Sequence, residues 1–513
     1  MASIGLRRPR PRHPSQTPSD TPARRRPLAA RCALLSFLWP GLGQIAGGAR
    51  RRGIFLAVLT ATLLVSVLVV LAQQGRDTLI GEAVDTRVLV GVLIADGLIV
   101  LFRLGAIADA ARLGYWAHGT VVTLAILATL VILPQAAAGW YAYKAYDTVT
   151  EVFEESEPTD VLVPVADEFD VPAETTTPPA GGLAGGDPTS IAGLTRTPED
   201  AAAALAAAER AKEKAKNRLA WQKRGRLNIV LLGADAGPGR SGLRTDTMMV
   251  ATIDLKTHRA AIFSVPRNMG GVPLPPRAAR AAGARFPGIL NALHGFGTAH
   301  PELFPGGKDP GATALKQTLG QLTGLPIDYY VMVDFRGFHG LVDALGGVTL
   351  EIPHAVLDRV SPYEKGGEWI RIDLKPGRQH LTADQAFAYV RARSTTSDWA
   401  RIKRQRCVIA ALADSTGPTT VLRSFRALTK TFRDNFSTDI PAKQLPALAK
   451  LATSIHMSQV VSIGFTPPEF TSGGTETGAA MPDIPAIRKA VRDALKKAPA
   501  TNDPRTIGGG ACF

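Results

Sequence analysis

The 513-residue chain has few cysteines and lacks the short motifs that mark several common enzyme classes. Its three cysteines cannot build a disulfide framework. Cys32 falls in an apolar segment, whereas Cys407 and Cys512 could pair outside the cell. No GxxxxGK(S/T) loop, GxSxG elbow, HExxH helix or pair of CxxC motifs occurs, which argues against P-loop, serine-hydrolase and zinc-protease chemistry. The nine histidines do not cluster with the spacing of metal ligands.

Acidic residues are outnumbered, 44 against 59 Lys and Arg, which gives a formal net charge of +15 and raises nucleic acid or an acidic membrane as partner. The excess is uneven, because residues 1–31 hold eight arginines and one acid, Asp20. This segment is rich in Pro and Ser and cannot bury a core, so it is expected to be a disordered basic tail. Beside a membrane, such a tail is better explained as a cytoplasmic topology signal than as a nucleic-acid arm.

Residues 32–143 contain four stretches that are largely free of charge, at 32–49, 53–75, 88–102 and 113–143. A helix needs about 20 apolar residues to cross a bilayer core, which the second and fourth stretches supply. The third is marginal and contains Asp96, either a functional acid within the membrane or a packing contact. The first is broken by Pro40 and several glycines. The sequence predicts a membrane region with one re-entrant segment and about three transmembrane helices.

Charges in the loops predict the orientation of these helices. Arginines at 50–52, 103 and 112 flank two of the helices, whereas the intervening loop, 74–86, carries three acids and one arginine. The positive-inside rule places the arginine-rich ends in the cytoplasm. Three crossings then put everything after residue 143 outside, which predicts a multi-pass protein of the cell membrane with an extracytoplasmic domain.

Residues 144–223 read as a spacer, first acidic and then rich in Pro, Thr and Gly, that holds the next domain off the membrane. An Ala-rich helix is expected at 198–221. The globular domain is expected at 224–468, followed by a C-terminal helix and flexible tail at 469–513.

The domain opens with three predicted strands, at 228–232, 248–253 and 260–265. The short connection between the last two predicts an antiparallel hairpin. Helices are expected at 309–324, 337–345, 381–390 and 398–415, with strands at 327–335 and 348–352. Asp309-Pro310 supplies a capping side chain and a first-turn proline, and Gly324 a stop signal. Alternating strands and helices predict a layered α/β domain.

Four charged residues are expected at one rim of the opening sheet: Asp235, Arg244, Asp246 and Arg267. Two acids and two arginines on a rigid sheet suit a metal-bound phosphate, since Mg²⁺ prefers one or two carboxylates plus phosphate oxygens. The alternative is that these are surface charges pairing with each other.

A second polar cluster consists of Arg391, Arg393, Asp398, Arg401, Arg404 and Gln405. Arg401 and Gln405 lie four residues apart, on one helix face. Arginine forks bind phosphate through two parallel hydrogen bonds, and a pyrophosphate needs several arginines. Alone, this run could equally be a solvated helix face or a nucleic-acid contact, but an extracytoplasmic position argues against nucleic acid.

Three blocks together resemble the LytR-CpsA-Psr (LCP) family of cell-wall glycopolymer ligases. They are LLGADAG…RTDTMMVATID…FSVPRN, LGQLTGLPIDYYVMVDFRGFHGLVDALGGVTLEIP, and GRQHLTADQAFAYVRARSTTSDWARIKRQR. The resemblance implies a three-layer α/β/α domain with a central mixed sheet, preceded by membrane helices. It also implies an enzyme that moves a glycopolymer phosphate from a polyprenyl-pyrophosphate carrier to a peptidoglycan hydroxyl, with Mg²⁺ or Mn²⁺. The implied partners are the lipid-linked glycopolymer, peptidoglycan and membrane lipid, and no nucleic acid.

The resemblance also assigns roles to eight residues. Asp235 and Asp246 match the metal-binding positions. Apart from the resemblance, a carboxylate within reach could take the hydroxyl proton, and Asp246 is our choice for that role. The pyrophosphate-binding positions are Arg244, Arg267, Arg391, Arg393, Arg401 and Gln405. The implied catalytic residues are the two acids, Asp235 and Asp246, together with Arg244, Arg267, Arg391 and Arg393. Two departures stand out: Asn268 replaces a frequent Asp, and Arg240 would have to replace an arginine usually nearer Asp235.

Other functions use the same residues. With water as the nucleophile the site would be a pyrophosphatase, and without turnover it would be a lipid-carrier binding protein. A non-enzymatic regulator would need a cytoplasmic DNA-binding module, but the basic tail shows no helix-turn-helix pattern. The lipid is expected to lie between the sheet and its covering helices, whereas the polymer, the acceptor hydroxyl and the oligomeric state stay open.

Overall fold

The computed structural model describes residues 28–73, 82, 84–153, 220–236, 243–363, 366–393, 398–415, 420, 423–474, 479–496, 499, 503 and 505–507. The chain divides into two compact units. The first comprises Met1–Gln74 and Gly91–Ala142, and the second comprises Gly75–Val90 and Tyr143–Phe513.

Three helices of the N-terminal region are long and apolar enough to cross a membrane, as predicted: α3 (Arg50–Gln73), α5 (Thr86–Arg112) and α6 (Thr120–Val152). Two shorter helices, α1 (Ala29–Leu38) and α2 (Leu42–Ala46), occupy the segment expected to be re-entrant. The buried Gln44 side chain fixes α2, because it accepts from Ser36 Oγ at 2.7 Å and donates to the Ala106 carbonyl at 2.8 Å.

Helix α5 extends well beyond the predicted 88–102 because partners satisfy the charges that follow. The Arg103 guanidinium donates to the Phe37 carbonyl at 2.7 Å, and Asp109 accepts from Gln44 at 3.2 Å. Asp96 lies against Gly139 of α6, where a Cβ would come within 3.2 Å of its carboxylate. That contact favours the packing alternative for Asp96.

A six-stranded mixed sheet organises the second unit, in the order β10-β3-β2-β1-β4-β9. Strand β2 is antiparallel to β1 and β3, β9 is antiparallel to β4, and the pairs β1–β4 and β3–β10 are parallel. The predicted hairpin is therefore confirmed. The bounds are β1 (Arg226–Asp235), β2 (Arg244–Asp254), β3 (Ala260–Val265), β4 (Tyr329–Asp334), β9 (Phe436–Thr438) and β10 (Val461–Gly464).

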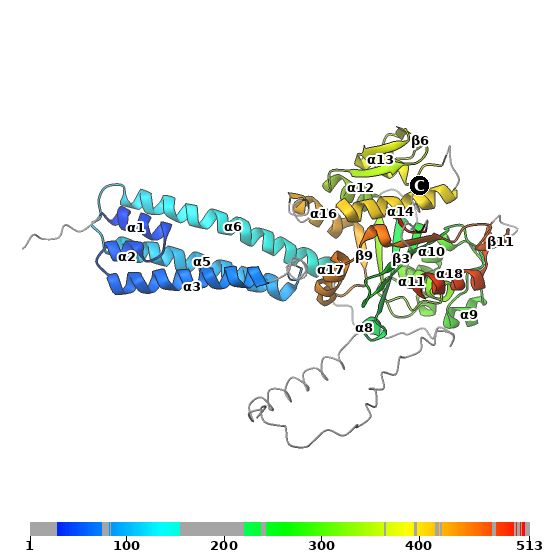
Figure 1. Ribbon diagram of the computed structural model, residues 1–513, viewed down its shortest axis with the longest axis horizontal. Helices are drawn as coiled ribbons and strands as arrows, with labels where there is room; N and C mark the ends of the chain where they lie inside the picture. Colours follow the sequence, from blue (N-terminus) through cyan, green and yellow to red (C-terminus); the bar gives the residue numbers. More distant parts are fainter. Residues whose placement is uncertain are drawn as a thin grey trace, which may run out of the picture. The chain divides into compact units, whose positions relative to one another are not determined.

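Helices cover both faces of this sheet (Figure 1). On one face α10 (Leu293–Ala299), α11 (Pro310–Thr323) and α18 (Ile484–Lys496) pack on side chains such as Val230 and Phe263. Helix α11 begins and ends as predicted, since Asp309 accepts from the Ala312 N–H at 2.9 Å and Gly324 takes a left-handed φ of 72°. Ile487 and Val491 of α18 are fully buried, so the core includes residues after the expected boundary at 468.

The opposite face carries α12 (Phe335–Ala344) and α14 (Asp398–Ser415). Alternate residues of the strands supply this face, among them Leu231 and Met249. The domain is therefore an α/β fold with a central mixed sheet between two helical layers, as expected.

Two short two-stranded sheets and a helix extend this second layer. Strand β5 (Val348–Ile352) pairs with β8 (Gly377–Leu381), and β6 (Val356–Val360) pairs with β7 (Ile370–Leu374). With α13 (Ala383–Tyr389) they form a second core against α12 and α14. The hairpin of β6 and β7 was not predicted from the sequence.

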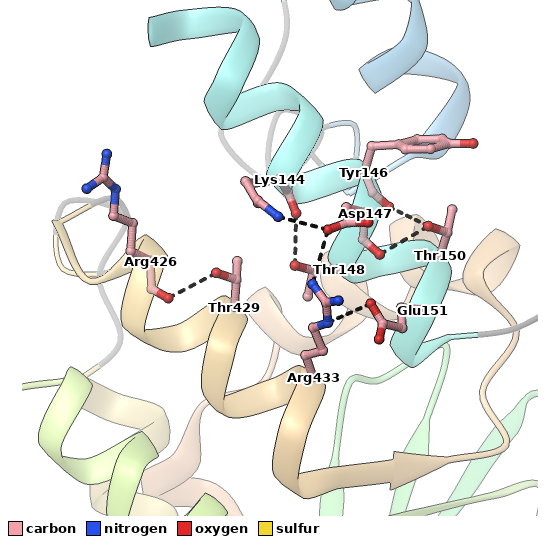
Figure 2. A network of polar contacts seen from close by, with 9 residues as sticks. All are labelled: Lys144, Tyr146, Asp147, Thr148, Thr150, Glu151, Arg426, Thr429 and Arg433. Atoms are coloured by element: carbon pink, nitrogen blue, oxygen red, sulfur yellow. Dashed lines mark hydrogen bonds and ion pairs between the residues drawn. The ribbon is translucent and has the colours of Figure 1, made fainter.

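Helix α6 runs to Val152, past the expected end of the membrane region at 143. Its last turns contact α16 (Phe425–Asn435), where Arg433 pairs with Glu151 at 2.7 Å and Asp147 at 3.3 Å (Figure 2). The last turns of α6 therefore contact the domain directly. Most of the spacer and of its expected Ala-rich helix lies outside the described residues.

Of the cysteines, Cys32 is buried and free, whereas Cys407 is disulfide-bonded. Cys512, with which it could pair, lies outside the described residues.

Candidate functional site

The ends of β1 and β3 and the start of β2 meet at one rim of the sheet. Asp235 at the end of β1 pairs in register with Arg244, and Val265 at the end of β3 pairs with Met248. Arg267 follows β3 and donates from Nη1 to Asp246 Oδ1 at 2.6 Å. The opening stretch therefore brings its charged residues to one edge, with Asp246 and Arg267 in direct contact.

A bulge in β2 orients Asp246. Gly233 pairs with Thr247 and Ala234 pairs with Thr245, so Asp246 is the extra residue between them. An extra residue bends a strand and turns its side chain away from the regular alternation. Gly233 permits the close approach, because a Cβ there would lie 2.9 Å from Thr247 Cβ. As a result both Asp246 and Thr247 line a cavity on the face covered by α12 and α14.

This cavity has a volume of about 770 Å³ and brings the two predicted clusters together. Seven of the eight expected site residues line it: Asp235, Asp246, Arg267, Arg391, Arg393, Arg401 and Gln405. They come from segments far apart in the chain, because β1, β2 and β4 form one wall and α13 and α14 approach from the covering layer. Arg244 does not line the cavity and is exposed.

Arg391 is held in a fixed position at the cavity wall. Its guanidinium donates to the Ser361 carbonyl at 2.7 Å and to Ser361 Oγ at 3.0 Å. It also lies over the rings of Phe335 and Phe387, 4.4 and 4.9 Å from their centroids. Stacking and two hydrogen bonds restrict the planar fork, so it presents a preorganised positive charge.

The first two turns of α14 supply the other polar groups. Arg401 is 3% exposed, and Gln405 Nε2 donates to the Val390 carbonyl at 3.3 Å. Arg404 has a different position, since its Nε donates to the Tyr389 carbonyl at 2.9 Å and its Nη2 to the Ala392 carbonyl. Arg404 thus fastens α14 to the end of α13 and is not a cavity residue.

Two further carboxylates line the cavity that the sequence did not single out as site residues, Asp334 and Asp358. Asp334 caps α12 by accepting from the Gly337 N–H at 2.8 Å, and burial raises its pKa although that hydrogen bond opposes the rise. Asp358 is 8% exposed and accepts from the backbone N–H groups of Arg359 and Arg393. The capping pattern before α12 could have located Asp334, whereas Asp358 lies in the unpredicted hairpin.

The interior of the cavity is apolar. Leu231, Val331 and Val333 of the sheet face Phe338 and Leu341 of α12 and Ile409 of α14. Leu231 precedes Asp235 by four residues of β1, a distance of roughly 13 Å along a strand. The cavity is therefore lined both by charged side chains and by a large set of apolar ones.

Asp235 and Asp246 could supply some, but not all, of the ligands of a magnesium or manganese ion. Among the residues that the structure describes, no group of three His, Cys, Asp or Glu converges as a complete metal cage. Asp235 and Asp246 nevertheless share one cavity with several arginines. Mg²⁺ is commonly held by one or two carboxylates with substrate phosphates and waters supplying the rest. The two acids suit that arrangement.

Sequence similarity to known proteins covers the part of the chain that forms this site. The sequence profile of the LytR_cpsA_psr family matches residues 193–481. The polyisoprenyl-teichoic acid–peptidoglycan teichoic acid transferase TagV of Bacillus subtilis is 26% identical over 298 residues, 57% of this chain and 70% of that protein. The probable cell wall biosynthesis protein LcpB of Corynebacterium glutamicum is 31% identical over 198 residues, 38% of this chain and 39% of that protein.

Among solved structures, the crystal structure of B. subtilis TagV is 24% identical and covers 53% of this chain and 98% of that chain, with a TM-score of 0.40. The family profile spans more than half of the sequence, including every block that carried the resemblance. The chain belongs to the LytR_cpsA_psr family.

Proposed function

We propose that this chain is a membrane-anchored phosphotransferase that attaches a glycopolymer from a polyprenyl-pyrophosphate carrier to peptidoglycan. The observation that carries the proposal is one cavity lined both by several arginines and by many apolar side chains. A polyprenyl pyrophosphate has the same two parts, an anionic head and a hydrocarbon chain. The names of relatives such as TagV support the classes of polymer and acceptor.

The arginines and Gln405 bind the pyrophosphate. Arg267, Arg391, Arg393 and Arg401 line the cavity and supply positive charge to a group that carries two or three negative charges. Arg244 stands at the exposed start of β2, and its role in binding is the least supported by its position.

Asp235 and Asp246 would hold Mg²⁺ or Mn²⁺. The ion, when bound, neutralises charge on the phosphate oxygens. The ion pair with Arg267 orients the Asp246 carboxylate toward the cavity.

In the reaction, an acceptor hydroxyl of peptidoglycan attacks the phosphorus attached to the glycan. A new O–P bond forms, the bridging P–O bond of the pyrophosphate breaks, and polyprenyl phosphate leaves. The hydroxyl proton passes to a carboxylate of the cavity wall, for which Asp246 is our assignment. Such a transfer asks mainly for positioning and charge stabilisation, so no protein nucleophile is needed.

The protein lies in the cell membrane with several crossings and with the catalytic domain outside. The arginines at the ends of α3 and α5 support this orientation. A reporter enzyme fused after residue 153 is expected to be active only in the extracytoplasmic compartment.

The proposal is tested with the purified full-length chain, lipid-linked wall polymer and peptidoglycan. We expect covalent attachment of polymer that is lost on chelation, restored by Mg²⁺ or Mn²⁺, and lost in Asp235→Ala. Release of phosphate without attachment would assign the site to a pyrophosphatase. Binding of the lipid without either product would leave a lipid-carrier binding protein.

A further inference from the structure

A second cavity of about 310 Å³ lies on the same side of the sheet. Of the residues that line it, only Thr438 has a polar side chain. Its walls include Ile229 of β1, Phe432 of α16 and Leu448 of α17 (Leu445–Thr453). A site of this composition offers almost nothing to a charged or hydrogen-bonding ligand but suits a hydrocarbon.

The two cavities are neighbours with shared walls, because Val331 of β4 and Phe436 of β9 line both. Strand β1 also connects them. Leu231 and Asp235 line the first cavity, and Leu227 and Ile229 line the second. Side chains at every second position face the same way, so these four residues form one continuous row. From Asp235 to Leu227 the row extends roughly 26 Å at the rise of a strand.

The end of helix α6 forms the far wall of the second cavity, through Val152 and Phe153. These residues belong to the same compact unit as the catalytic domain. Contacts outside the cavity hold them in place: Arg433 pairs with Glu151 at 2.7 Å, and the Ala442 N–H donates to the Phe153 carbonyl at 3.1 Å. Figure 2 shows Arg433 of α16 facing the last turns of α6.

We propose that the second cavity receives the distal isoprenoid end of the lipid carrier and that the membrane anchor itself completes this site. The lipid's identity rests on the proposed function. The head lies among the arginines of the first cavity, the chain follows the row along β1, and its end reaches the last turn of α6. An apolar route that ends at a membrane-spanning helix lets the hydrocarbon remain out of water along its length. The anchor is then part of the substrate site.

The first experiment measures binding without turnover. The full-length chain in lipid nanodiscs is incubated with polyprenyl phosphate that carries a photoreactive diazirine at its far end, in a long and a short version. We expect the long probe to label peptides of α16, α17 or the end of α6, and the short probe to label only α12 and α14. Labelling of α12 and α14 alone by the long probe would overturn the proposal.

The second experiment compares two acidic substitutions three residues apart. Phe153→Asp places a carboxylate in the wall of the cavity, whereas Thr150→Asp places one on α6 outside it. We expect Phe153→Asp to weaken binding of the long probe about tenfold, equivalent to about 1.4 kcal/mol, and Thr150→Asp to leave it unchanged. Equal affinities in both variants would contradict the inference.

The two proposals fail in different ways. Correct labelling by the long probe without any polymer transfer would leave the lipid site standing and refute the transferase. Polymer transfer without labelling of the second cavity would refute only the lipid extension.

Discussion

Replacing Arg391 by lysine is expected to reduce transfer although the charge is kept. The guanidinium makes two hydrogen bonds to Ser361, at 2.7 and 3.0 Å, and stacks over two phenylalanine rings. A lysine ammonium on a flexible stem cannot reproduce a planar fork that stacks and donates in two directions. The substitution therefore removes preorganisation while it leaves one positive charge at the cavity.

The size of the effect follows from those contacts. A hydrogen bond that involves a charged group contributes about 1.5–3 kcal/mol, and each 1.4 kcal/mol is about tenfold in a rate or binding constant. Loss of one such bond to the pyrophosphate predicts a fall in kcat/KM of about tenfold to a hundredfold. Arg391→Ala, which also removes the charge, is expected to lose more.

The assay is attachment of polymer to peptidoglycan by the full-length chain, measured over a range of lipid-linked donor concentrations. Arg371→Lys is the matched control, because Arg371 is an exposed residue of β7 outside the cavity. Thermal unfolding of each variant checks that the fold is retained. A kcat/KM for Arg391→Lys within twofold of the unsubstituted chain would refute the reasoning that the fixed fork matters.

Three further predictions concern stability and the anchor. The first two are measured by unfolding of the full-length chain in detergent, and the third is measured by the rate of polymer transfer to peptidoglycan. Gly311→Ala should lower the free energy of unfolding by about 1–3 kcal/mol, because the new Cβ would come within 2.6 Å of His294 ring atoms. Gly295→Ala is the control, since a Cβ there meets open space, and it should leave the free energy of unfolding nearly unchanged. Equal effects of the two substitutions would contradict this prediction. Burial would raise the pKa of Asp309, but the interaction with His294, whose Nε2 lies 3.4 Å from Asp309 Oδ1, and hydrogen bonds from helix N–H groups lower it overall. The contribution of Asp309 to stability is therefore present above the unfolded pKa of about 3.9 and is lost as the pH falls through the lower folded pKa. Asp309→Asn should therefore reduce the fall in the free energy of unfolding at acid pH. An unchanged acid dependence in this variant would contradict the prediction. Arg433→Ala removes both ion pairs between α16 and the end of α6. It should reduce polymer transfer more when the lipid-linked donor is embedded in a membrane than when the donor is solubilised in detergent. Equal losses with the two donors would argue that these ion pairs do not hold the end of α6 in place for function.

Much of the local structure could be predicted because short signals specify it. Asp309, Pro310 and Gly324 set the limits of α11, and the short connection after β2 set its hairpin with β3. These are contacts between neighbours in sequence, for which capping groups and turn geometry suffice. The long apolar helices could also be predicted, since a run of about 20 apolar residues is typical of a helix that crosses a bilayer.

Errors arose where distant partners decide the outcome. Helix α5 runs past its predicted end because Phe37 and Gln44 satisfy Arg103 and Asp109. Arg404 belonged to the expected phosphate cluster, but the carbonyls of Tyr389 and Ala392 bind its guanidinium instead. No local pattern distinguishes a cavity arginine from one that fastens two helices together.

The sequence by itself determined the family, the membrane helices, the strands and the residue types of the site, because hydrophobic pattern and capping act over a few residues. Only the tertiary structure decided that the β2 bulge turns Asp246 into the cavity, that Asp334 and Asp358 join its wall, and that the end of α6 closes a second cavity. Each of these depends on backbone segments that meet across the fold. Their energy comes from packing and hydrogen bonds between partners that the linear order does not specify.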